Sequence, residues 1–206
     1  METNSKGAAS SQETVQEQHG LPQEKRTIIQ QEKKGLQIRD ILLIAILLAS
    51  GAVLKFFVGS IINFGMKPNF IIAMYCLTIL LIKPRLIEAA IIGLLAGAVS
   101  QFFPGQPYLN FASELTGAVA MCLLAKIPLE KLKIPLTPIL GTFLSTIVSG
   151  FTFIGLMYLL YYARSGILRT PPTPLAIFMA IIFGTAAINA VIVQVLYIPL
   201  KLALKK

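Results

Sequence analysis

Long apolar runs are the feature that most limits what this chain can fold into. A helix that crosses the hydrocarbon core of a membrane needs about 20 mostly apolar residues, and stretches of this kind follow one another after residue 40. Because lipid offers no partner for backbone N–H and C=O groups, such stretches cross as helices. The composition agrees, with 55% hydrophobic and 13% charged residues against about 25% charged in soluble domains. The sequence therefore predicts an all-α integral membrane protein.

Six membrane-spanning helices are expected. They cover residues 41–57, 61–82, 87–103, 109–127, 134–163 and 174–204. The second is the least regular, because its apolar run from residue 68 is short and reaches span length only when residues 61–66 are added. Residues 1–40 contain no comparable run and are rich in Gln, Glu, Lys and Ser. We expect a disordered cytoplasmic tail over 1–40 and a six-helix transmembrane domain over 41–206.

The positions of the basic residues predict an orientation. If both termini are cytoplasmic, fourteen of the 18 Lys and Arg residues fall on the inner side and four on the outer side. This bias is typical of a bacterial plasma-membrane protein with both ends inside. The net charge of +9 then reflects orientation and contact with anionic lipid headgroups, and we predict no nucleic-acid site. Lys55, near the outer end of the first span, is expected to snorkel to the interface.

Catalytic and metal-binding motifs are absent from the sequence. It contains no Walker A loop, no His-Glu-x-x-His, no Cys-x-x-Cys and no Gly-x-Ser-x-Gly. The single histidine, His19, lies in the expected tail, and Cys76 and Cys122 lie inside apolar runs, where a thiol behaves as a small hydrophobe. We therefore expect no enzymatic activity, no metal and no cofactor. A chain of this kind that moved a solute uphill would take its energy from another protein.

Residues 101–117 are the part of the membrane domain that apolar packing does not explain. Glu114 lies on the early turns of an otherwise apolar helix, where a charge at membrane depth costs roughly 2.5–3.5 kcal/mol and usually faces a partner or a wet cavity. Amides, cations and aromatic rings are expected at the same outer end. The candidate substrate-binding residues are Lys67, Asn69, Gln101, Phe103, Gln106, Tyr108, Asn110 and Glu114. The alternative is an ordinary aromatic belt with a few interfacial amides.

Small residues recur at four-residue spacing and predict close helix packing. Four of the expected spans carry such faces. They include Ala45 and Ala49; Ala89, Gly93 and Gly97; Gly141, Ser145 and Ser149; and Ala186 and Ala190. Most of these faces are expected to pack inside the bundle, and at least one is a candidate docking face for another protein.

Several short motifs resemble the S-components of energy-coupling factor (ECF) transporters, and among them the tryptophan-specific S-component family. They are Gly65-Met66-Lys67-Pro68-Asn69, Pro84-Arg85, Phe103-Pro104-Gly105-Gln106 with Asn110, and Asn189 with Tyr197-Ile198-Pro199. The resemblance covers residues 41–204 and adds Asn189 to the candidate binding residues.

The resemblance implies an S-component-like bundle that captures its substrate from outside. It also implies docking onto a transmembrane coupling subunit driven by two ATPase subunits, with Ala45 and Ala49 on the docking surface. Tryptophan is the implied substrate, within an ABC-type importer. Three alternatives remain open: an S-component for another micronutrient or vitamin, an intramembrane lipid-modifying enzyme, and a membrane scaffold.

Overall fold

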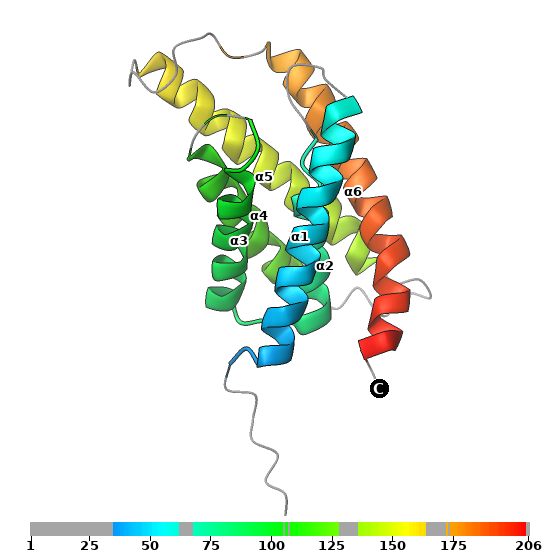
Figure 1. Cartoon of the computed structure of the whole chain (residues 1–206). Coiled ribbons are helices and arrows are strands. Elements are labelled where there is room, and N and C mark those ends of the chain that lie inside the picture. Colours follow the sequence, from blue (N-terminus) through cyan, green and yellow to red (C-terminus); the bar gives the residue numbers. More distant parts are fainter. Residues whose placement is uncertain are drawn as a thin grey trace, which may run out of the picture. The chain divides into compact units, whose positions relative to one another are not determined.

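The computed structural model of the chain is all-helical over the residues that it describes. These residues are 35–61, 68–104, 106, 108–127, 136–163, 172 and 174–204. Six helices lie in them: α1 (Ile38–Ile61), α2 (Ile71–Ile82), α3 (Leu86–Ser100), α4 (Leu109–Leu124), α5 (Thr137–Tyr162) and α6 (Leu175–Leu204). The described part contains no strand (Figure 1). The prediction of an all-α fold is confirmed for these residues. Of the expected tail over residues 1–40, residues 1–34 lie outside the described residues, and residues 38–40 belong to α1.

The first helix starts earlier than expected. It begins at Ile38 instead of residue 41, so Asp40 lies in its first turn and does not precede it. The Asp40 carboxylate Oδ2 accepts a hydrogen bond of 3.1 Å from the backbone N–H of Gln37, which satisfies a donor next to the helix start. At the same end of the bundle, the Arg39 guanidinium donates to the carbonyl oxygen of Leu204 at 2.9 Å. The start of α1 and the end of α6 therefore lie side by side.

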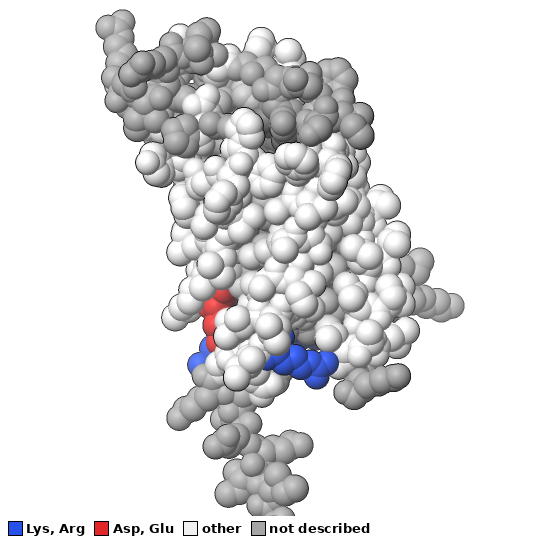
Figure 2. All heavy atoms as spheres, viewed as in Figure 1, with Lys and Arg blue, Asp and Glu red and all other residues white. Residues whose placement is uncertain are grey.

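Three of the described helices, α1, α5 and α6, are long and apolar enough to cross a membrane, and α2, α3 and α4 are shorter. Large apolar side chains cover their outer surfaces, with Ile46 and Leu159 62% exposed and Val195 65% exposed. On the face shown in Figure 2, the charged side chains of the described residues gather near one end and leave the middle uncharged. Such a surface is stable against lipid and not against water. Six full crossings and the orientation of the termini remain predictions.

Helix α2 forms the centre of the bundle. Every residue from Ile71 to Leu80 is buried, and α2 packs against each of the other five helices. A helix that is surrounded on all sides needs apolar residues on all sides, which explains why this run shows no polar face. With 12 residues, α2 is only about 18 Å long. The expected start of the second span at residue 61 is wrong, because Ile61 ends α1 and α2 begins at Ile71. The short apolar run itself is the core of the fold.

Glycine lets α3 and α4 approach closely. A Cβ atom at Gly93 would lie 2.7 Å from the backbone oxygen of Glu114, and one at Gly97 would lie 2.8 Å from the Cα of Phe111. Neither backbone could move away without shifting a whole helix. The prediction that this face packs inside the bundle is confirmed. It also places the backbone of Glu114 directly against α3.

The small-residue faces of α5 and α6 are internal as well. Their members are buried, and several carry hydroxyl groups. They are Gly141, Thr142, Ser145, Thr146 and Ser149 on α5 and Ala186, Asn189 and Ala190 on α6. The two helices therefore bring polar side chains into the bundle together with the space that small residues leave.

Candidate binding site

Glu114 lies inside the bundle. It sits in the second turn of α4, on the early turns that the sequence indicated, with an exposed fraction of 0%. The side-chain amide of Asn69, just before α2, donates to its Oε1. Asn189 of α6, also 0% exposed, donates from Nδ2 to the backbone oxygen of Asn69 at 3.1 Å and to Oγ1 of Thr146 at 3.4 Å. We call Asn69, Glu114, Thr146 and Asn189 the polar cluster; it joins four parts of the chain.

Three oxygen atoms of the polar cluster have no hydrogen-bond partner in the described part of the chain. They are Oδ1 of Asn69, Oε2 of Glu114 and Oδ1 of Asn189, and all three are buried. Amide and carboxylate oxygens only accept hydrogen bonds, and a buried group left unsatisfied costs about 1–3 kcal/mol. The polar cluster therefore holds three buried acceptors without a hydrogen bond, and the buried Tyr75 hydroxyl also lacks one. A bound group that carries several N–H donors would match it.

Tyr75 of α2 extends the polar cluster toward the middle of the bundle. Its ring is fully buried, and its hydroxyl group packs against Gly117 of α4 where a Cβ would stand. Tyr75 and Ser149 both interact with the Glu114 side chain. Farther along α5, the Ser145 hydroxyl donates to the backbone oxygen of Gly117 at 2.8 Å. A line of hydroxyl groups thus runs from Glu114 into the interior between α2, α4 and α5.

The sequence reasoning missed these hydroxyl-bearing residues. Thr142, Ser145, Thr146 and Ser149 recur at the spacing of one helix face, and we interpreted the serines among them only as small packing residues. The spacing itself was the available indication, because four hydroxyls on one face of a membrane helix need partners inside the protein. Tyr75 gave no such indication, since a single Tyr in an apolar run is also typical of lipid-facing or core positions.

Lys55 is the second charged residue at this site, and the expectation that it snorkels to the interface is wrong. Its side chain is only 7% exposed, and Nζ lies 5.1 Å from the ring centroid of Phe103. This is a cation–π contact, which gains strength when it is desolvated. Lys55 also interacts electrostatically with Glu114. Phe103, a candidate from the sequence, therefore lies beside a buried cation.

Gln101 and Tyr108 contact each other and bridge the connection from α3 to α4. The Gln101 amide donates to the backbone oxygen of Gly97 at 3.1 Å, and its oxygen accepts from the backbone N–H of Tyr108 at 3.4 Å. Tyr108 is 73% exposed and has a left-handed backbone with φ of 65°. These contacts hold the loop in shape and do not extend to the polar cluster.

The remaining candidates lie on either side of this loop. Asn110 is half-buried in the first turn of α4, and its backbone oxygen accepts from the hydroxyl of Ser113 at 3.3 Å. Gln106 is half-buried in the loop itself. Lys67 lies outside the described residues. Of the nine candidates, Asn69, Glu114 and Asn189 are brought together, and Phe103 reaches the same region through Lys55.

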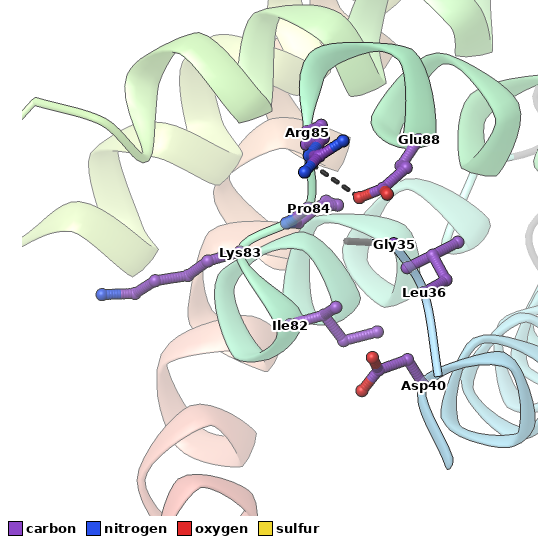
Figure 3. Close-up of a pocket in the computed structure, with 8 residues that line it drawn as sticks. All are labelled: Gly35, Leu36, Asp40, Ile82, Lys83, Pro84, Arg85 and Glu88. Atoms are coloured by element: carbon purple, nitrogen blue, oxygen red, sulfur yellow. Dashed lines mark hydrogen bonds between the residues drawn. The ribbon is translucent and has the colours of Figure 1, made fainter. Parts of the chain in front are cut away.

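A small hollow lies at the other end of the bundle, where α1 begins and α2 ends (Figure 3). Its volume is about 70 Å³, far below the roughly 300–1,000 Å³ of small-molecule pockets. The Glu88 carboxylate accepts from the backbone N–H of Arg85 at 2.8 Å and caps α3. Lys83 points away from the hollow (Figure 3). The carboxylates here, Glu88 and Asp40, cap helix starts, so this hollow is not a substrate site.

The proposed docking residues lie on the outer face of α1. Ala45 and Ala49, one turn apart, are both exposed, as are their neighbours Ile46 and Val53. Small side chains at these two positions leave a shallow strip along the helix, which suits close approach of another helix. Whether a partner occupies this strip remains a prediction.

The fold and the site together define a class. A bundle with a lipid-facing apolar surface and a buried cluster of carboxylate, amide and hydroxyl groups is a multi-pass membrane protein with a candidate binding site. Residues 37–205 match the model of the family described as Tryptophan transporter TrpP, and the chain belongs to this family. The resemblance inferred from the sequence is thereby confirmed, as is a location in the cell membrane.

A curated relative agrees with the family. The probable tryptophan transport protein of Clostridium acetobutylicum is 26% identical over 173 residues, which cover 82% of this chain and 96% of the relative. No solved structure matches the chain. The family match over residues 37–205 therefore spans all six described helices, and the relative is also named as a transport protein.

Proposed function

We propose that this protein is the substrate-capture subunit of an ECF-type importer and that its substrate is tryptophan. The family match supports tryptophan as the solute. The three buried oxygens without a hydrogen bond support the polar cluster as the binding site. Tryptophan offers an ammonium group and an indole N–H, both donors. An ammonium beside Glu114 would supply hydrogen bonds to the unpartnered oxygens of Asn69, Glu114 and Asn189. This unmet need for donors is the observation that carries the proposal.

Partner proteins supply the energy in this proposal. The sequence contains no nucleotide-binding motif, and a binding protein alone cannot move a solute uphill, because release needs a partner that favours another state. A transmembrane coupling subunit and two ATPase subunits would fill this role. The exposed strip at Ala45 and Ala49 is the proposed docking face.

Equilibrium binding of tryptophan to the purified protein tests the substrate. We expect Glu114→Gln to weaken binding by roughly 10- to 100-fold, because one charge-assisted hydrogen bond to the ammonium is lost. Glu88→Gln is the matched control, since this carboxylate caps α3 at the hollow described above and should leave affinity unchanged. Absence of binding across a panel of aromatic amino acids would overturn the assignment of tryptophan as the substrate.

Co-purification in mild detergent tests the partners. We expect a larger membrane subunit and two ATPases to accompany the wild type. Ala49→Trp should abolish this association and cellular uptake, because an indole group fills the strip on α1, while tryptophan binding to the isolated protein stays intact. Uptake by cells that lack the ATPases would contradict the proposal.

A further inference from the structure

Lys55 is a buried cation that membrane packing alone does not require. It lies on α1, a helix whose other described charges, Arg39 and Asp40, are at its first turn, and it is only 7% exposed. Lysine is almost never fully buried without a pairing role, and a charge inside the bilayer marks a functional position by default. The side chain could reach the interface by snorkelling, as the sequence suggested. The fold buries it instead, against Phe103 and within electrostatic reach of Glu114.

The polar cluster offers hydrogen-bond acceptors and Lys55 offers a positively charged donor in the same region. The polar cluster contributes the buried acceptor oxygens of Asn69, Glu114 and Asn189. Lys55 contributes an ammonium group that lies 5.1 Å from the ring centroid of Phe103 and interacts electrostatically with Glu114. An α-amino acid carries an ammonium and a carboxylate on neighbouring atoms, so it complements both at once. A molecule that has only one of these groups complements one of them.

We propose that Lys55 binds the carboxylate of the substrate and thereby restricts the site to zwitterionic amino acids. This inference rests on the proposed function and assigns a specificity-determining role to α1, a helix that the sequence connected only with docking. Lys55 and Glu114 then divide recognition between them, the lysine for the carboxylate and the glutamate for the ammonium. Phe103 positions the lysine through the cation–π contact.

Three indole ligands separate the two roles. Tryptophan has both charged groups, tryptamine lacks the carboxylate, and indole-3-propionate lacks the ammonium. For Lys55→Met we expect affinity for tryptophan and indole-3-propionate to fall roughly 10- to 100-fold, the range for a hydrogen bond between charged groups. Affinity for tryptamine should stay the same or rise, because a nearby positive charge has been removed. Lys55→Arg should keep most of the affinity for tryptophan.

Glu114→Gln gives the reciprocal pattern. It should lower the affinity for tryptophan and tryptamine and leave the affinity for indole-3-propionate unchanged. If Lys55→Met instead lowers the affinity for tryptophan and for tryptamine equally, the inference is overturned and Lys55 is a structural counter-ion of Glu114. Absence of tryptophan binding by the wild type would instead overturn the proposed function itself.

If Lys55→Met does not fold, a variant in which both Lys55 and Glu114 are replaced by uncharged residues still tests the inference. The double variant Lys55→Met with Glu114→Gln removes both charges and leaves no unmatched ion in the bundle. It should bind tryptophan and tryptamine equally weakly. Retention of the wild-type preference for tryptophan over tryptamine by this variant would contradict the role of Lys55.

Discussion

Gly117 offers a sharp test of the packing that supports the polar cluster. A methyl group at this position would collide with the Tyr75 hydroxyl and lie 2.9 Å from Cβ of Ser149 and 3.3 Å from Cζ of Tyr75. Tyr75 has an exposed fraction of 0%, so its ring has no free space into which it can turn. Gly117→Ala should therefore strain α2, α4 and α5 together.

The magnitude follows from two opposing terms. Overpacking a tight core costs about 1–3 kcal/mol, and alanine gains up to about 1 kcal/mol over glycine in a helix interior. Gly155→Ala in α5 is the matched control, because nothing lies within 4 Å of its Cβ position and only the helical gain applies. We expect Gly117→Ala to be about 1–3 kcal/mol less stable than this control. Tryptophan binding should weaken as well, since Tyr75 interacts with Glu114.

Unfolding titrations in mixed micelles measure the difference, and Tyr75→Phe isolates its cause. Removing the hydroxyl group takes away the closest contact and leaves the ring carbon at 3.3 Å. The double variant should recover about 1 kcal/mol or more relative to the sum of the single changes, within the usual range for residues in contact. Recovery stays partial because Ser149 remains close. Additive effects, or equal stability of Gly117→Ala and Gly155→Ala, would refute the packing argument.

Two further predictions concern the contacts between helices. Gly93→Ala should destabilise the bundle by about 1–3 kcal/mol, because its Cβ would lie 2.7 Å from the backbone oxygen of Glu114. Gly184→Ala is the control and should not destabilise it, since nothing lies within 4 Å of its Cβ position. Equal unfolding midpoints for the two variants would contradict the close approach of α3 and α4. Thr152→Val removes the 3.0 Å hydrogen bond from the Thr116 hydroxyl and should cost about 0.6 kcal/mol, the average for such bonds between membrane helices. A loss well above 2 kcal/mol in the same titration would show that Thr152 does more than join α4 to α5.

The sequence alone determined the class of protein and the approximate positions of its helices, apart from the start of α2. Apolar run length and the breaks at Pro and Gly depend on local chemistry, so six helices were expected and six are found in the described residues. It also singled out Glu114, since a carboxylate in an apolar helix needs an explanation wherever the helix packs. The family followed from short motifs in the same way.

Tertiary structure decided which side chains meet. Asn189 and Asn69 are 120 residues apart in sequence and in hydrogen-bond contact in the fold. The packing of the helices against one another brings them together. The same packing turned Lys55 inward and made α2 the centre of the bundle. Periodicity in one helix cannot reveal either outcome, because burial in lipid and burial in protein favour the same apolar residues.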